Sequence, residues 1–332
     1  MGGMFVEDCK VRNTIPRKIY RRVRNLPSEL ALWVINRPAI EAKLRTSHDR
    51  ARNNHLASLP KLSDQDAEIV ERLNRDGVCV TTLGALSLPL NSEMFASAKL
   101  IAKTYEQRVR QNVYHGWETI MVTPDEIMSN PAIFLWGLNQ RLLNIVEAYL
   151  GLPVAYDGMN MFYTVADGRQ IGTRKWHRDR EDRRMVKIAI YCNDVDEGGG
   201  PLQVVRPNVI TGNLVDKFTY PALSQELLEA RIGGPITDRD VVTCTGPAGT
   251  IVFSDTARQY HRGKPATSRD RCAIYYNYFS RRPRHPFFCE RSGLSRAQIA
   301  ELSHTLAPEQ KSCVTWHDSL SPIARLIPRN VV

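Results

Sequence analysis

The 332-residue sequence predicts a mainly β fold with flanking helices, in the α+β class. Two observations predict it. Helical patterns occupy the chain before Gly151, and after Gly151 the sequence changes to short β-rich segments separated by glycine and proline. Short strands of this kind, backed by helices, are typical of a double-stranded β-helix, the cupin-like jelly roll. The expected strands are residues 154–165, 184–192, 201–206, 249–255 and 271–280.

The chain before Gly151 is predicted to be largely helical. Residues 10–28 contain seven basic residues and no acidic one, with Ile19, Val23 and Leu26 at helical spacing. This pattern predicts a basic amphipathic helix, packed on the protein by its apolar stripe or in contact with an anionic surface or nucleic acid. Further helices are expected over residues 30–45 (interrupted at Pro38), 63–77, 91–110 and 130–151, and a strand over residues 78–83.

Three parts are expected along the chain. Residues 1–61 form a basic helical extension, residues 62–290 the β-rich domain, and residues 291–332 a C-terminal helix and tail. Residues 213–240 are predicted to be an insertion in the domain. A short helix from Ser224 to Arg231 lies in this insertion, and we expect it to close over a site as a lid. Ser295 opens the C-terminal helix, and the tail after Thr305 has no regular pattern.

Composition limits the class of protein. The formal net charge of +10 favours anionic partners in general but does not by itself indicate nucleic acid. The seven cysteines are widely spaced and form no Cys-x-x-Cys pair, which argues against a disulfide framework or a zinc site and favours a reducing compartment. No segment approaches the roughly 20 apolar residues of a membrane span. Since no signal-type apolar core lies near the N-terminus, a cytoplasmic location is expected.

The residues most informative for function are His177, Asp179 and His261. Two imidazoles and one carboxylate on one face of an octahedral Fe(II) leave the other positions open for a cosubstrate and O2. Side chains at positions i and i+2 of a strand project from the same face, so His177 and Asp179 can point at one ion. His261 is the distal ligand. The sequence therefore predicts a catalytic metal site made of these three residues.

A second group of residues is predicted to bind the cosubstrate. Arg271 begins a β-rich run, and its planar guanidinium can hold the far carboxylate of a dicarboxylic acid through two hydrogen bonds. Arg269, two residues earlier, is an alternative anchor. Asn160 and Thr164 share one face of a predicted strand and can hydrogen-bond the cosubstrate or the substrate, although surface polar residues would give the same pattern.

With their surroundings, these residues resemble the phytanoyl-CoA dioxygenase (PhyH) family of Fe(II)/2-oxoglutarate oxygenases. The surroundings are Trp176, the segments 194–205 and 246–255, and the interval from His261 to Arg271. The resemblance covers approximately residues 62–282. Its most specific parts are the His-x-Asp triplet, the Gly-Pro-Leu segment and the His-to-Arg ending.

The resemblance implies a 2-oxoglutarate-dependent non-haem iron dioxygenase. Such an enzyme uses Fe(II), 2-oxoglutarate and O2 to hydroxylate, desaturate or cyclise at an unactivated C–H bond of a small molecule, such as a natural product, and releases succinate and CO2. The intact Asp179 disfavours halogenation, because related halogenases have glycine or alanine there. The resemblance also places Lys187 beside 2-oxoglutarate, although an exposed lysine at a sheet edge would explain that residue equally well.

Other hypotheses stay open. The chain could be a non-catalytic or nucleic-acid-binding jelly-roll protein that uses the basic N-terminal helix, or an enzyme that modifies a macromolecule. A small-molecule substrate is the main expectation, and nucleic acid is not. The charged run 178–184 could receive an anionic group, but such a run is more often a solvated turn. Neither the substrate nor the oligomeric state is indicated by the sequence.

Overall fold

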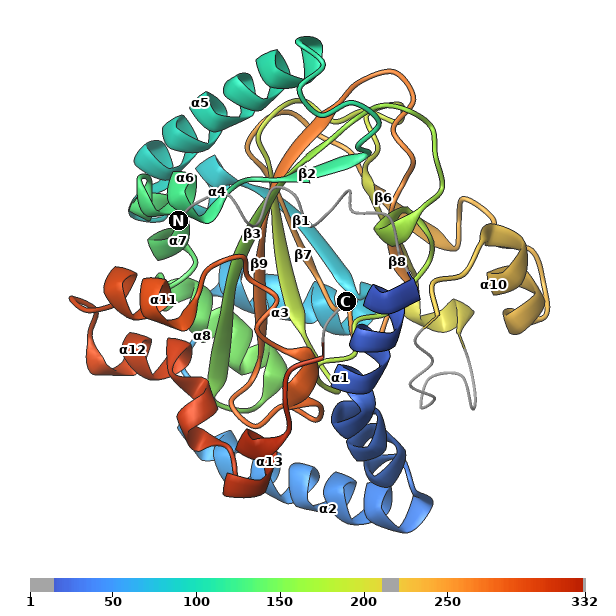
Figure 1. The fold of residues 1–332 in the computed structure, drawn as a ribbon. Coiled ribbons are helices and arrows are strands. Elements are labelled where there is room, and N and C mark those ends of the chain that lie inside the picture. The colour runs from blue at the N-terminus through green and yellow to red at the C-terminus, as the bar shows by residue number, and fades with distance from the viewer. Residues whose placement is uncertain (1–14, 211–220, 331–332) are drawn as a thin grey trace.

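The computed structural model describes residues 15–210 and 221–330 (Figure 1). Their strands form two antiparallel sheets. The larger sheet has the order β1-β7-β4-β9-β3-β2, and the smaller has the order β6-β5-β8. Strands distant in sequence are therefore neighbours, as where β9 lies between β4 and β3.

The described strands are short, apart from β3 and β9. The longest ladder joins these two, from Val154 paired with Ser280 to Thr164 paired with Arg271, with an irregularity between Tyr156 and Met159. The strands are β1 (Val78–Thr82), β2 (Thr119–Met121), β3 (Val154–Thr164), β4 (Val186–Tyr191), β5 (Leu202–Val205), β6 (Val241–Cys244), β7 (Thr250–Ser254), β8 (His261–Gly263) and β9 (Arg271–Ser280).

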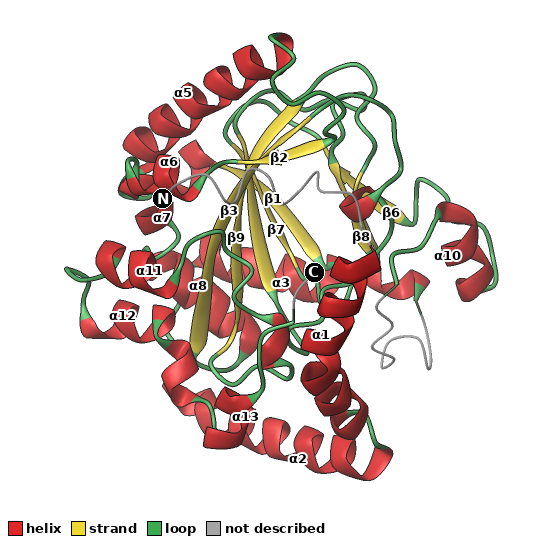
Figure 2. Cartoon of the chain, viewed as in Figure 1, coloured by secondary structure: helices red, strands yellow, loops and turns green. Residues whose placement is uncertain are grey.

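Most of the helices lie to one side of the larger sheet, away from the smaller sheet (Figure 2). The described helices are α1 (Ile15–Ile35), α2 (Pro38–His55), α3 (Asp64–Asp76), α4 (Leu83–Leu86), α5 (Asn91–Arg110), α6 (Pro124–Met128), α7 (Pro131–Trp136), α8 (Gln140–Leu150), α10 (Gln225–Ile232), α11 (Arg296–Leu302), α12 (Pro308–Val314) and α13 (Pro322–Leu326). Short 3-10 turns are η1 (Leu56–Ser58), η2 (Gly172–Arg174), η3 (Pro207–Val209), η4 (Pro286–Phe288) and η5 (Trp316–Ser319).

Alternation along β4 shows how the core is divided. Val186, Ile188 and Ile190 belong to the main apolar core, which includes buried residues of α3, α5, α7 and α8. Ala189 and Tyr191 project to the other face and pack against residues of β5 and β6 from the smaller sheet. Because side chains alternate in a strand, the larger sheet has one face under helices and one face toward the smaller sheet.

The helix boundaries follow local sequence signals. Ser63 caps α3 through a hydrogen bond from the backbone N–H of Asp66 to its hydroxyl. Gly77 ends the helix in the left-handed conformation, with a φ of 74°. Directly after Gly77, β1 begins and pairs with β7 at the edge of the larger sheet.

The expected α+β class is confirmed, and the strands pair antiparallel. Helices, however, occupy more of the described chain than strands do, so "mainly β" understates them. All five strands expected after Gly151 are present, while β2, β6 and β8 were not expected. The single helix expected over residues 130–151 is two helices, α7 and α8.

Two expectations about the ends of the chain change as well. The tail after Thr305 is not irregular, since it contains α12 and α13. The helix expected over residues 10–28 is α1, which extends to Ile35, and residues 10–14 lie outside the described residues. No helix among the described residues is long and apolar enough to cross a bilayer.

Candidate metal centre

Backbone pairing brings the three predicted ligands together. His177 and His261 form an antiparallel bridge, in which the N–H of each donates to the carbonyl oxygen of the other at 3.0 and 2.9 Å. The N–H of Asp179 donates to the carbonyl oxygen of Thr256 at 2.8 Å. The segment 177–179 is thus attached at two points, to Thr256 in the loop after β7 and to His261 at the start of β8.

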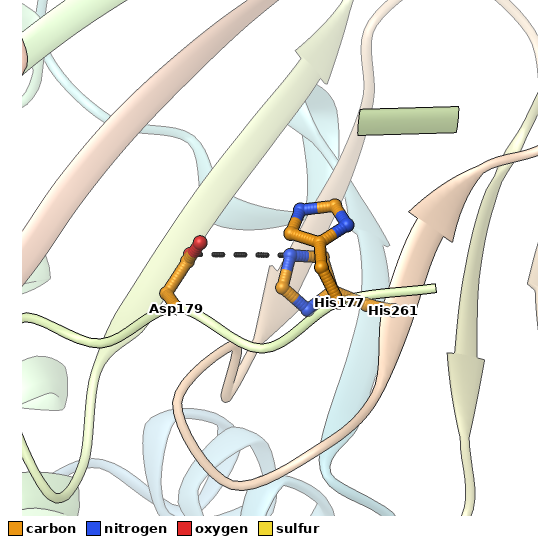
Figure 3. A group of neighbouring side chains, drawn as sticks. All are labelled: His177, Asp179 and His261. Atoms are coloured by element: carbon orange, nitrogen blue, oxygen red, sulfur yellow. Dashed lines mark ion pairs between the residues drawn. The ribbon is translucent and has the colours of Figure 1, made fainter. Parts of the chain in front are cut away.

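The three side chains converge (Figure 3). One ligand atom from each of His177, Asp179 and His261 lies within 4.8 Å of the others. The imidazole centroids are 4.2 Å apart, and Asp179 Oδ2 lies 3.9 Å from His261 Nε2. This spacing suits one ion held by two nitrogens and one oxygen. Among the described residues, no other group of three histidine, cysteine or acidic side chains meets this spacing.

Each imidazole is oriented by a backbone carbonyl two residues earlier. His177 Nδ1 lies 2.8 Å from the carbonyl oxygen of Lys175, and His261 Nδ1 lies 3.2 Å from that of Gln259. Since a carbonyl only accepts, Nδ1 carries the proton in both rings and Nε2 keeps its lone pair. A partner of this kind on the far nitrogen is usual for histidines that bind metals.

The charge states also suit a metal. Burial lowers the pKa of His177, and burial together with the neighbouring His177 lowers the pKa of His261 to about 3. Burial acts to raise the pKa of Asp179, but Lys187, His261 and His177 outweigh it and hold that pKa below its usual range. At neutral pH the site therefore presents two neutral imidazoles and one carboxylate, the forms that bind a cation.

Lys187 lies in the candidate site, and its observed partner is Asp179, one of the three candidate metal ligands. Its ammonium is 2.6 Å from Asp179 Oδ2. Because side chains alternate along a strand, Lys187 shares the inner face of β4 with Ala189 and Tyr191, and it is opposite Ser254 and Asn277 in the neighbouring strands. It is not an exposed edge lysine, since β4 is central in its sheet. Contact between Lys187 and a cosubstrate stays a prediction.

Arg271 lies between the two sheets, and Arg269 does not. Arg271 is 6% exposed, and its Nη1 donates to the carbonyl oxygen of Gly200. Its Nε is buried without a hydrogen-bond partner among the described residues. The Arg269 side chain is 59% exposed and lies 3.8 Å from Asp196. Of the two arginines, only Arg271 offers an inward-facing guanidinium with unused donor capacity.

Thr164 and Asn160 differ in their surroundings. Thr164 is buried and lies directly opposite Arg271 in the β3–β9 ladder, so it belongs to the same inner region. Asn160 lies opposite Tyr275, and its side-chain oxygen accepts a hydrogen bond from the N–H of Gly293 at 3.2 Å. The amide oxygen of Asn160 thus already anchors the C-terminal segment.

The described part of the insertion does not form the expected lid. α10 packs beside Trp176, whose indole N–H donates to Gln225 at 2.7 Å. The guanidinium of Arg262 also packs on Trp176 and lies 4.2 Å from the centroid of its ring. Trp176 precedes His177 and Arg262 follows His261. Because side chains alternate along a strand, Trp176 and the helix α10 that packs on it lie on the face opposite to the two imidazoles. Residues 213–220 of the predicted insertion lie outside the described residues.

Two residues near the site were not among the site residues predicted from the sequence. Glu181 lies close enough to Asp179 and Lys187 for their charges to interact, and burial raises its pKa. Gly263 lies against Arg271, since a Cβ on it would be 2.9 Å from Arg271 Nη2. A glycine two residues after His261 could have indicated this contact, because a glycine within a strand often marks a place where another group approaches the backbone closely.

The chain was compared with known proteins. No family model matches it, and no curated protein matches it. Among solved structures, AviO1 from Streptomyces viridochromogenes is 18% identical with a TM-score of 0.43, over 66% of this chain and 96% of that one. The non-heme alpha ketoglutarate dependent carbocyclase SnoK from nogalamycin biosynthesis is 16% identical with a TM-score of 0.44, over 66% and 85%.

A third similar structure is EctD from S. alaskensis with bound Fe. It is 16% identical with a TM-score of 0.43, over 71% of this chain and 88% of that one. At such values of identity and superposition, none of these likenesses assigns a function to this chain.

Proposed function

We propose that this protein is an Fe(II)- and 2-oxoglutarate-dependent oxygenase that oxidises an unactivated C–H bond of a small molecule and releases succinate and CO2. One observation carries the proposal: two pre-oriented imidazoles and one carboxylate converge in a protein whose nearby inner face holds an arginine with an unused donor. Three protein ligands of this type leave positions for a cosubstrate and O2.

The donor set fits iron better than the common structural metals. The site contains no thiolate, and a three-ligand arrangement does not close a tetrahedron as structural zinc requires. When bound, iron would supply the activation of O2 coupled to decarboxylation of the keto acid. The chain's own part is to hold the ion through His177, Asp179 and His261 and to orient the acid.

Arg271 is the proposed anchor for the far carboxylate of 2-oxoglutarate. Gly263, which Arg271 contacts, lies two residues beyond His261 on β8, roughly 7 Å along the strand. A five-carbon dicarboxylic acid has about this reach, so one end can lie at the metal while the other meets the guanidinium. Thr164, opposite Arg271, is the proposed second contact at that end, and Asn160 the more distant one.

Lys187 is proposed to act chiefly through Asp179. Its ammonium contacts Oδ2, the carboxylate oxygen that also lies 3.9 Å from His261 Nε2, and this contact limits rotation of the carboxylate beside the two imidazoles. The expected direct contact with 2-oxoglutarate is kept as a second role for the same lysine.

The finer fold and family assignments belong to the same proposal. We propose that the two antiparallel sheets are the two halves of a double-stranded β-helix, because the residues between them form one buried cluster and the ligands lie at one end of it. Of the 2-oxoglutarate oxygenases, the PhyH type is the one whose motifs the sequence resembles.

Succinate formation is the test. Purified protein with Fe(II), ascorbate and 2-oxoglutarate should form succinate during a screen of metabolites, and His177→Ala or Asp179→Ala should abolish both this and binding of Fe(II). The matched control is His304→Ala, since His304 is exposed and lies outside the candidate site. Metal binding that is unchanged in both site variants would refute the proposed centre.

A further inference from the structure

Helix α1 presents an apolar stripe to solvent. Ile19, Val23, Leu26, Leu30 and Trp33 recur at alternating spacings of four and three, which places them on one helix face. Their exposed fractions run from 54% at Leu26 to 63% at Leu30. Tyr20 and Val34 widen the same stripe. Contiguous exposed apolar surface of this kind usually marks a contact with something else.

The face of α1 that packs on the protein is mixed, with the polar Asn25 and Ser28 buried and the apolar Leu32 and Ile35 half-buried. Asn25 and Ser28 are buried, and Ser28 Oγ donates to the carbonyl oxygen of Asn25 at 2.8 Å. Asn330, near the C-terminal end, donates its side-chain N–H to Ser28 Oγ at 3.1 Å. A helix of a globular protein normally buries its apolar face and exposes its polar one. In α1 the larger apolar stripe faces solvent instead, and its contact with the guanidinium of Arg37, 3.6 Å from the Trp33 ring centroid, leaves it more than half exposed.

The same helix carries exposed positive charge, with Arg22 on the flank of the stripe. Arg21, Arg22 and Arg24 are exposed, and the chain has no acidic residue from position 10 to 28. Arg24 donates to the hydroxyl of Tyr20, which places its guanidinium at the edge of the apolar surface. An exposed face with tryptophan, leucine and isoleucine, bordered by arginines, is typical of helices that lie in the interface of an anionic bilayer.

We propose that α1 binds the surface of an anionic lipid membrane, with its apolar stripe among the acyl chains and its arginines at the headgroups. A second copy of the chain fits less well, because pairing two stripes would bring two strongly basic segments together. Nucleic acid would engage the arginines and leave the apolar residues in water. The stripe from Ile19 to Trp33 spans roughly 21 Å, long enough to lie along a membrane but with no requirement to cross it.

Trp33 provides an internal reporter. It is 57% exposed, whereas the other four tryptophans, Trp117, Trp136, Trp176 and Trp316, are buried or half-buried. Titration of the full chain with vesicles of phosphatidylcholine and phosphatidylglycerol should shift its fluorescence to the blue, and Trp33→Phe should remove the shift. Vesicles of phosphatidylcholine alone should give at least ~10-fold weaker binding, because three or more arginines lose their anionic partners.

Variants separate the apolar from the charged contribution. Leu26→Ser with Leu30→Ser should weaken vesicle binding at least ~30-fold without changing the charge, and Arg21→Gln with Arg22→Gln should weaken it ~10-fold or more at low salt. Leu100→Ser is the matched control, because Leu100 is 66% exposed on α5 and outside the stripe.

The proposal is overturned if the full chain fails to bind anionic vesicles, if the leucine variants bind them as well as the unchanged chain, or if the leucine changes convert a dimer into a monomer. Binding to DNA that is stronger than binding to vesicles, and insensitive to the leucine changes, would overturn it in favour of nucleic acid. None of these outcomes depends on the proposed oxygenase activity.

Discussion

The close contact between Gly263 and Arg271 makes a sharp prediction for Gly263→Ala. The backbone of Gly263 is not in the left-handed region, so alanine introduces no backbone strain. Its Cβ would lie 2.9 Å from Arg271 Nη2 and 3.4 Å from Nη1, and the guanidinium would have to move. The displaced atoms are the end of a flexible side chain, so the fold should persist while the guanidinium loses its position.

The magnitude follows from the hydrogen bonds at stake. An ordinary contact is at least 3.4 Å, so the guanidinium moves by about half an ångström or more. Loss of one charge-assisted hydrogen bond costs about 1.5–3 kcal/mol. The affinity for 2-oxoglutarate should therefore fall about 10- to 100-fold, with the affinity for the metal unchanged.

Calorimetric titration of 2-oxoglutarate into the anaerobic metal-loaded protein measures this loss. Gly234→Ala is the matched control, because a Cβ there meets nothing within 4 Å. Arg271→Ala should weaken binding at least as much as Gly263→Ala. If Gly263→Ala binds 2-oxoglutarate normally while Arg271→Ala does not, the positional argument is wrong, and if both bind normally, Arg271 is not the anchor.

Three further predictions concern stability and the alternative arginine. Arg141→Ala should lower the free energy of unfolding by about 3–5 kcal/mol in denaturant titrations, because it leaves the buried Asp66 carboxylate unpaired. The control is Arg72→Ala, which breaks an exposed ion pair with Glu68 and should lower the free energy of unfolding by less than about 1 kcal/mol. Burial lowers the pKa of His285 from 6.5 to about 3, so below pH 6.5 the unfolded chain takes up a proton that the folded chain does not. The free energy of unfolding should therefore fall as the pH is lowered from 7.5 to 5, and His285→Gln should reduce that fall by about 2 kcal/mol. A pH profile that the substitution leaves unchanged would refute the lowered pKa of His285. Arg269→Ala should leave 2-oxoglutarate affinity within about twofold of the unchanged protein, since its side chain faces solvent; a loss as large as that of Arg271→Ala would reverse the choice of anchor.

Local signals in the sequence predicted much of the fold. Ser63 and Gly77 delimit a helix because capping and left-handed backbone depend on neighbouring residues alone. The alternation of Lys187 with Val186 and Ile188 likewise identified the two faces of β4. The five strands expected after Gly151 were found because β-rich runs bounded by glycine and proline mark them in the sequence.

Features set by distant contacts could not be predicted in this way. β8 has three residues, too few to show a pattern, and it is a strand because β5 pairs with it. The helix expected to continue from Asn130 breaks near Gly137, where a Cβ would lie 2.5 Å from the Tyr276 ring. The contact of Lys187 with Asp179 depends on how the segment before β4 folds back, which spacing does not reveal.

The mutual backbone hydrogen bonds of His177 and His261 have a consequence for handling the protein. Peptide hydrogen bonds join the two residues directly, so the position of their imidazoles rests on backbone pairing. A zinc finger, in contrast, unfolds when its metal is taken away. Treatment with a chelator should thus yield a folded apoprotein with nearly unchanged circular dichroism, into which cobalt, nickel or manganese can be introduced afterwards for spectroscopy.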